Sequence, residues 1–532
     1  MLINFIQNAL QYLLILATLL TFGVWTIGVR DYQFLRFYTL FVTVIILIIT
    51  VIILLNYDTN LFVFEIQQIF VPALGEFFHR NFRVIPYFFI IGLSIDLEQV
   101  VFFASNYILN FNFFYLHYII YYQPAIIFCF GVDKLTLLFL LLTTSVFPIV
   151  ILTFWTETQR VRQVFFHILF LELCLLCTFT VLTFWGFYIF FELLLIPMMH
   201  LLLIWGSRQR KIKATMYFFL YTFAGSLLML IALVLIYKNI GNSIFFYLQN
   251  ISISENEQIL LWFLSFWAFA IKIPMVPFHL WLPEAHAEAP TGGSIVLAAI
   301  LLKLGVYGFI RILLPIFPLG MLYFRPLVIT LALISICYTS LTLFRQIDIK
   351  RIIAYCSIAH MNGVILGFLT NTFEGFEGAY NLMIAHTFSS LGLFACAGIL
   401  YSRFGTRIIH HYGGLVKIMP VFSFFYFIFI LANFGFPITY NFIGEFLIIL
   451  GVILTQNNFL IIGLVIGFIT SVIYSIFLFT RTSFGELNLL YLRNAPTNDI
   501  IRFEICILGL TSIILIGLFF KPYYITILTP LM

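Results

Sequence analysis

Apolar residues follow this chain in stretches of about 20, the length that an α-helix needs to cross the hydrocarbon core of a membrane. The stretches predict helices near 8–28, 36–56, 133–154, 163–184, 186–205, 214–238, 258–280, 293–316, 325–344, 350–371, 376–400, 418–451, 457–480 and 503–527. Within 57–130, Asn, Tyr and Gln interrupt the apolar runs, so a surface-lying or strand-like excursion is expected there. The predicted fold class is all-α: a polytopic membrane protein of about 14 transmembrane helices.

Composition supports a membrane environment. Apolar residues make up 63% of the chain and charged residues 9%, which is too little polar surface to cover a water-soluble globule of 532 residues. The seven cysteines lack the spacing of a disulfide framework. The 67 phenylalanines and abundant isoleucine favour an AT-rich organellar genome. The mitochondrial inner membrane is therefore expected, with a bacterial plasma membrane as the alternative.

Basic residues concentrate in alternate loops. If successive helices alternate in direction, one side of the membrane holds most of the Lys and Arg residues, including the run Ser207–Lys213. The other side holds few of them and carries acidic residues such as Glu255 and Glu257. By the positive-inside rule, the basic side faces the cytoplasm or the matrix. Contact with anionic lipid is a second explanation for the basic run.

Two long apolar segments are broken by proline at comparable positions. Pro274 and Pro277 interrupt 258–280, and Pro437 interrupts 418–451, because each proline removes an amide donor and clashes with the preceding turn. Paired broken helices in corresponding halves are typical of inverted-repeat transporters. Ordinary kinks, which are common in membrane helices, are the alternative.

This pairing predicts two inverted repeats in which helices 7 and 12 are broken. The predicted units are helices 1–2 with a divergent extension at 1–130, helix 3 at 131–162, a first repeat of helices 4–8 at 163–316, a second repeat of helices 9–13 at 325–480, and helix 14 with a tail at 481–532.

Ionisable residues accompany both breaks. Lys272 directly precedes the first break and Glu445 follows the second, while Lys303 lies about ten residues inside the next apolar segment. A lysine at the bilayer midplane costs about 2.5–3.5 kcal/mol even on the lenient insertion scale. Charges placed at that cost are candidates for a functional site.

Several segments carry a family resemblance. They are FELLLIPMMHLLLIWG at 191–206, AFAIKIPMVPFHLWLPEAHAEAPTGGS at 268–294, LAAILLKLGVYGFIRI at 297–312, QIDIKRIIAYCSIAHMNGVILG at 346–367, AHTFSSLGLF at 385–394 and FPITYNFIGEF at 436–446. From about residue 131 to 482 the chain resembles the NADH-ubiquinone oxidoreductase subunit 4 family, antiporter-like proton-pumping subunits of respiratory complex I. The HAEAP loop and paired lysines favour subunit 4 over its paralogues, subunits 2 and 5. Thr387 departs from the family, which usually has glycine there.

The resemblance implies proton-transfer roles for six residues, namely Glu192, Lys272, Lys303, His360, His386 and Glu445. The chemistry agrees, since protons cross a membrane by hopping between groups that both accept and release them. Burial weakens the hold of a lysine on its proton and a nearby carboxylate strengthens it, so a Glu–Lys pair can act as a switch. Imidazole exchanges protons near neutral pH and suits intermediate steps.

Each of the six residues also has a structural alternative. These alternatives are an interhelical ion pair for Glu192 and Lys272, snorkelling toward an interface for Lys303, hydrogen-bonded packing for His360 and His386, and capping of the distal half-helix for Glu445.

Other constellations are weaker. His279, Glu284, His286 and Glu288 match no zinc spacing, and a structural loop at the membrane surface is expected instead. Cys174 and Cys177 form C-x-x-C inside an apolar helix and are expected to be packing thiols. No dinucleotide-binding motif, P-loop or Fe–S ligand set is present.

The predicted function is proton translocation by a membrane-arm subunit of NADH:ubiquinone oxidoreductase, without redox chemistry in this chain. No cofactor is expected in it, since the resemblance implies FMN, Fe–S clusters and ubiquinone in partner subunits. Expected partners are subunits of the types 2 and 5, accessory subunits and membrane lipids, and not nucleic acid. The alternatives are a subunit of a multi-subunit Na⁺/H⁺ antiporter and a non-conducting scaffold of the membrane arm.

Overall fold

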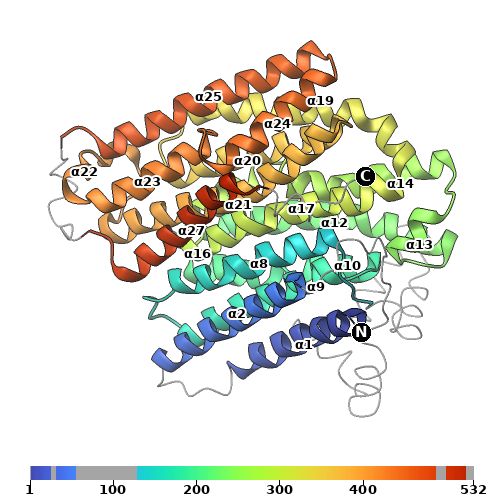
Figure 1. The fold of residues 1–532 in the computed structure, drawn as a ribbon, viewed down its shortest axis with the longest axis horizontal. Coiled ribbons are helices and arrows are strands. Elements are labelled where there is room, and N and C mark those ends of the chain that lie inside the picture. Colours follow the sequence, from blue (N-terminus) through green and yellow to red (C-terminus); the bar gives the residue numbers. More distant parts are fainter. Residues whose placement is uncertain (1, 25–31, 56–128, 487–498, 523–532) are drawn as a thin grey trace.

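The structure, a computed structural model, describes residues 2–24, 32–55, 129–486 and 499–522, and is built from helices lying side by side (Figure 1). The helices that begin the described chain are α1 (Leu2–Gly23), α2 (Tyr32–Leu55) and α8 (Lys134–Thr153). Those within the predicted first repeat are α9 (Val161–Thr180), α10 (Phe184–Leu193), α11 (Leu195–Trp205), α12 (Lys211–Ile240), α13 (Phe245–Asn250), α14 (Glu255–Lys272), α15 (Trp281–Glu288), α16 (Thr291–Val296), the π-helix η1 (Leu297–Leu301), α17 (Leu302–Gly308), the π-helix η2 (Phe309–Leu313) and α18 (Leu314–Ile316).

The rest of the chain continues the same architecture. Its helices are α19 (Pro318–Leu343), α20 (Ile349–Leu369), α21 (Phe373–Phe404), the 3₁₀ turn η3 (Ile409–His411), α22 (Leu415–Ile418), α23 (Pro420–Asn433), α24 (Tyr440–Leu454), α25 (Asn458–Ser483) and α27 (Arg502–Phe520). Among the described residues, three isolated β-bridges occur and no β-strand.

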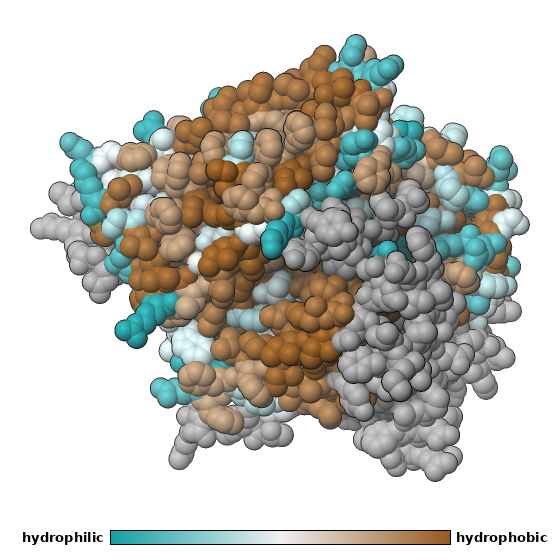
Figure 2. All heavy atoms as spheres, viewed as in Figure 1, coloured by the Kyte–Doolittle hydropathy of each residue, from teal (hydrophilic) through white to brown (hydrophobic). Residues whose placement is uncertain are grey.

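Length and hydropathy identify membrane-crossing helices. In the described part of the chain, 11 helices are long and apolar enough to span a membrane, and shorter apolar helices include α23 and α24. Figure 2 shows apolar residues along the flanks of the helices, with hydrophilic residues toward their ends. The central part of helix α21 is fully buried, while α25 exposes apolar side chains as a lipid-facing helix does. The predicted all-α polytopic fold is confirmed.

The predicted spans all contain helix where the structure describes them, with two local differences. The span 186–205 is divided at Leu194 into α10 and α11. The predicted surface loop near His286 is wrong, because Trp281–Glu288 forms the buried helix α15. Residues 57–128 of the expected excursion lie outside the described residues. The boundaries of the two repeats stay predictions.

Both predicted helix breaks are present. Helix α14 ends at Lys272 and helical structure resumes only at Trp281, across Pro274 and Pro277. Helix α23 ends at Asn433 and α24 begins at Tyr440, across Pro437. The second break includes two residues in the left-handed region, Gly435 with φ +64° and Ile438 with φ +88°. Backbone of this kind is tolerated at membrane depth only where protein or water surrounds it.

Candidate functional site

Four of the six candidate residues form a continuous buried row. Nζ of Lys303 on α17 lies 2.7 Å from Nδ1 of His386 on α21. The rings of His386 and His360, the latter on α20, are 5.6 Å apart between centroids. Nδ1 of His360 then lies 3.6 Å from Oε1 of Glu445 on α24. Each separation is within reach of a direct hydrogen bond or of one bridging water.

Lys303 is held inside the protein rather than at an interface. Its side chain is 1% exposed, and its ammonium also donates a hydrogen bond of 2.7 Å to the carbonyl oxygen of Ala298. The helix segment that carries it lies between the two π-helical turns η1 and η2, which are frequent at functional sites. Snorkelling is therefore excluded for Lys303.

The two histidines face ionisable partners. His360 and His386 are 6% and 2% exposed, and each lies against an ionisable side chain of a different helix. Thr387, the departure from the family pattern, donates to the Met383 carbonyl and leaves α21 unbroken. These contacts favour proton exchange over simple packing, because a packing histidine needs no ionisable partner.

The second helix break positions the carboxylate of Glu445. This carboxylate packs over Gly435, and a Cβ at that position would collide with Oε2 of Glu445. Helix α24 takes Thr439 as its N-cap and has no acidic residue in its first turn. The capping alternative for Glu445 is therefore wrong, since the carboxylate faces His360 instead.

Glu192 and Lys272 lie near each other without a direct bond. Nζ of Lys272 sits 4.7 Å from the centroid of the Phe191 ring, and neither it nor Oε1 of Glu192 has a hydrogen-bond partner among the described residues. The two side chains interact electrostatically, and Glu192 also lies against Ser226 on α12. A permanent structural ion pair does not fit this arrangement. The pair is instead placed so that a side-chain movement can close or open it.

Close packing brings α17 to Lys272. A Cβ at Gly305 would lie 3.1 Å from Cβ of Lys272 and 2.9 Å from Cγ1 of Ile273, so only glycine allows this approach. Lys272 makes no hydrogen bond to Lys303, since its Nζ has no hydrogen-bond partner among the described residues, whereas Lys303 is hydrogen-bonded to the next group, His386.

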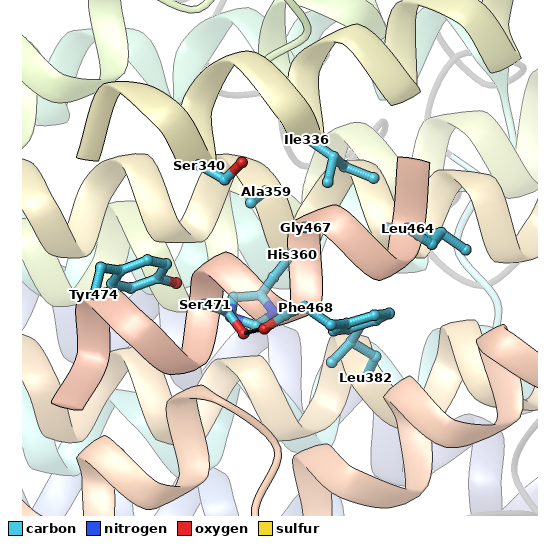
Figure 3. A pocket seen from close by; sticks show the side chains of 11 residues that line it. Ile336, Ser340, Ala359, His360, Leu382, Leu464, Gly467, Phe468, Ser471 and Tyr474 are labelled. Carbon is cyan, nitrogen blue, oxygen red and sulfur yellow. Dashed lines mark hydrogen bonds between the residues drawn. The ribbon is translucent and has the colours of Figure 1, made fainter. Parts of the chain in front are cut away.

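A small cavity lies beside His360 (Figure 3). Its volume is about 30 Å³, which is enough for one or two water molecules. Helices α19, α20, α21 and α25 line it, mostly with apolar side chains, and its hydroxyl groups come from Ser340, Ser471 and Tyr474. A pocket of this size beside His360 has room for the water through which proton exchange would pass.

Sequence reasoning missed several buried polar contacts. Lys350, the first residue of a predicted helix, is 1% exposed and donates to the Ala289 carbonyl at 2.7 Å. Asp133 and Arg311 form an ion pair of 2.5 Å between α8 and the η2 turn. Glu172 on α9 is 1% exposed, and neither carboxylate oxygen has a hydrogen-bond partner among the described residues. An acidic residue inside an apolar run is visible in the sequence, so Glu172 could have been singled out there.

The residues weighed as a metal cluster, such as Glu284 and His286, make structural contacts with other helices instead. His286 stacks on Phe394 with 4.6 Å between ring centroids, and Glu284 pairs with Arg351 at 2.9 Å. Within the described ranges, no group of three or more His, Cys, Asp or Glu residues is placed to hold a metal ion. These residues belong to the packing of α15 against α20 and α21.

Comparison with known proteins agrees with this geometry. The family model described as NADH:quinone oxidoreductase/Mrp antiporter, TM, matches residues 183–473. NADH-ubiquinone oxidoreductase chain 4 of Chondrus crispus is 44% identical over 459 residues, which are 85% of this chain and 91% of the relative. The same-named protein of Acanthamoeba castellanii is 40% identical over 501 residues, 92% of this chain and 99% of the relative.

Solved structures give the same result. A chain of respiratory complex I from Thermus thermophilus with bound NADH is 31% identical, with a TM-score of 0.70, covering 76% of this chain and 84% of that one. A chain of the Mrp complex from a Dietzia species has a TM-score of 0.69 at 16% identity, covering 75% and 83%, and shares the fold alone. On sequence identity and coverage together, this chain belongs to the NADH-ubiquinone oxidoreductase chain 4 family.

Proposed function

We propose that this protein moves protons across the mitochondrial inner membrane along the row Glu192, Lys272, Lys303, His386, His360 and Glu445. As a member of the chain 4 family it is a multi-pass subunit of NADH-ubiquinone oxidoreductase, a proton-translocating enzyme complex, and it works with other subunits of that complex. The single observation that carries the relay is the row of close contacts from Lys303 to Glu445 inside a membrane-spanning bundle.

The close contacts from Lys303 to Glu445 support transfer in short steps. A proton on Lys303 passes to Nδ1 of His386 along their 2.7 Å contact. Transfer on to His360 crosses the space between the two rings, where a water molecule can complete the path. His360 then delivers the proton to Glu445 across 3.6 Å. Each group accepts and releases a proton, which is what a relay requires.

Glu192 and Lys272, at the start of the row, would control when a proton enters it. When Lys272 approaches Glu192, the carboxylate stabilises the lysine charge and holds the proton there. In the present arrangement the two side chains interact electrostatically without a hydrogen bond. When they separate further, a charged Lys272 loses that stabilisation and its proton is released toward Lys303 more readily. Opening and closing of this pair would couple the chain to events in its partners.

Redox chemistry is assigned to the partner subunits. This sequence carries no dinucleotide-binding motif and no Fe–S ligand set, so FMN, Fe–S clusters and the ubiquinone site are proposed for other subunits. Subunits of the types 2 and 5, accessory subunits and membrane lipids are the proposed neighbours. The apolar flanks of the outer helices provide surface for them.

Neutralising Glu192 or Lys272 in the assembled complex tests the proposal. Glu192→Gln and Lys272→Met are expected to abolish most NADH-driven proton uptake into vesicles, while NADH oxidation by an artificial acceptor that bypasses quinone is unchanged. Glu172→Gln is the matched control, because it neutralises a buried carboxylate on the neighbouring helix α9 that lies outside the row. Normal proton translocation in both row variants would overturn the proposal and favour a scaffold.

A further inference from the structure

We infer that helix α20 mechanically connects the two broken helices, with Asn362 holding the first break and Cys356 holding the second. This inference rests on the proposed relay, and it adds Asn362, Cys356 and Ser335 as positioning residues. None of the three belongs to the row of proton-transfer groups. Their role would be to make the two halves of the relay respond to each other.

The first break is held by side chains from the other predicted repeat. The backbone N–H of Val276 donates to Oγ of Ser335 on α19 at 2.8 Å. The carbonyl of Pro274 accepts from Nδ2 of Asn362 on α20 at 3.2 Å. Both side chains are 0% exposed, so water does not compete for these backbone groups. The segment that follows Lys272 is thus fixed by α19 and α20 rather than only by its own helix.

Asn362 is anchored firmly enough to transmit a displacement. Its amide nitrogen also donates to the carbonyl of Ile358 in its own helix at 2.8 Å. The two amide hydrogens are therefore divided between α20 and the first break. A shift of Pro274 must either stretch this bond or move α20 with it.

The second break is held from the same helix. Sγ of Cys356 donates to Oδ1 of Asn433, the last residue of α23, at 3.0 Å. The same thiol lies 2.6 Å from the hydroxyl of Tyr474 on α25, so it joins α20, α23 and α25. This contact lies at the start of the break that positions Glu445 over Gly435.

The spacing along α20 places His360 between the two ties. Cys356 and His360 are four residues apart and share a helix face, while Asn362 lies six residues after Cys356, about 240° around the axis. The two ties therefore leave α20 in different directions toward the two breaks. A movement of the first break that accompanies Lys272 would shift His360, and through Cys356 would reach the second break.

Paired variants distinguish a connection from two local packing bonds. Asn362→Leu removes the donor to Pro274 at similar volume, and Cys356→Ala removes the donor to Asn433. Each is expected to reduce coupled NADH:quinone turnover by about 2- to 30-fold, the range for residues that transmit coupling without touching the reacting groups. If α20 is a single connection, the double variant is expected to be no worse than the more damaging single variant.

Matched controls lie on the same or neighbouring helices. Ser335→Ala removes the acceptor for Val276, whereas Ser475→Ala removes a buried hydroxyl of α25 that donates only within its own helix. Cys396→Ala on α21 is the control for Cys356→Ala, since Cys396 is equally buried. Ser335→Thr keeps the acceptor oxygen and is expected to retain coupling. If Asn362→Leu fails to assemble, Asn362→Ala replaces it.

The readouts are the coupled NADH:quinone turnover per assembled complex, the number of protons moved per electron and the pH profile of quinone reduction. The inference is overturned if the variants lower only the amount of complex and leave all three readouts unchanged, or if the two single effects on turnover multiply in the double variant. Lys272→Met separates a failure of the proposed relay from a failure of the connection through α20. Normal pumping in Lys272→Met removes the proposed relay, whereas loss of pumping there with normal Asn362 and Cys356 variants removes only the connection.

Discussion

Replacing Lys303 by arginine separates a proton relay from an electrostatic support. Lys303 donates 2.7 Å hydrogen bonds to His386 and to the Ala298 carbonyl from a position that is 1% exposed. Arginine keeps the positive charge and has enough donors for both acceptors, but a guanidinium does not release its proton in proteins. A structural role survives this change, whereas a relay does not.

The magnitude follows from the two side-chain types. Unperturbed arginine holds its proton with a pKa about 2 to 3 units above that of lysine, and each unit is about 1.4 kcal/mol. Because both side chains occupy the same buried position, we take this difference to apply there. The barrier to releasing the proton toward His386 then rises by about 3 to 4 kcal/mol, which slows that step by about 100- to 1,000-fold.

The assay compares three variants in the assembled complex. Lys303→Arg and Lys303→Met are both expected to lose NADH-driven proton uptake and coupled quinone reduction, while electron transfer to an artificial acceptor that bypasses quinone continues. Lys303→Gln controls for the loss of charge with a hydrogen-bonding group retained, and is expected to fail as well. Normal proton uptake in Lys303→Arg, with failure of Lys303→Met, would refute the relay role and leave Lys303 as a fixed charge.

Two further predictions concern positions outside the transfer steps. Arg311→Met leaves the carboxylate of Asp133 without its 2.5 Å partner, so it is expected to destabilise the bundle by about 3 to 5 kcal/mol. The measurement is the melting temperature of the purified complex, which should fall. Adding Asp133→Asn should recover part of the loss, and an unchanged melting temperature would contradict the pairing. Gly435→Ala places a Cβ against Glu445 at φ +64°, where a non-glycine residue costs about 1–2 kcal/mol, and should impair proton uptake, whereas Gly509→Ala, with nothing near its added Cβ, should not.

The helices were predictable because each follows from a strong local signal. An apolar run of membrane length has few alternatives, and prolines such as Pro274 and Pro437 mark where a helix must stop. The short helix Trp281–Glu288 was not predicted, because its polar residues resemble a surface loop until the packing around them is known. Its burial comes from contacts with distant helices, which no window of the sequence contains.

The sequence was enough to predict which residues are candidates, but not which of them lie next to each other. An acid, lysine or histidine inside an apolar run stands out because an ionisable side chain costs free energy in the membrane interior. The family motifs selected six such residues. Pairings such as Lys303 with His386 depend on which helix faces which, and 83 residues separate that pair in sequence. Asn362 was overlooked for a different reason, since a neutral amide in a helix gives no signal until its partner, the Pro274 carbonyl, is known.

The uneven spacing of the row indicates where control resides. Beyond Lys303 the groups are close enough for a proton to distribute itself among them without large side-chain movement, with contacts of 2.7 Å and 3.6 Å at the two ends. Before Lys303, Lys272 has no hydrogen-bond partner among the described residues and rests against the Phe191 ring. A buried ammonium in that position is costly unless a partner approaches, so its side chain is poised to move. We therefore expect the movement of Lys272 to set the rate of the proposed relay, and the helix break beside that residue to be the element that allows it.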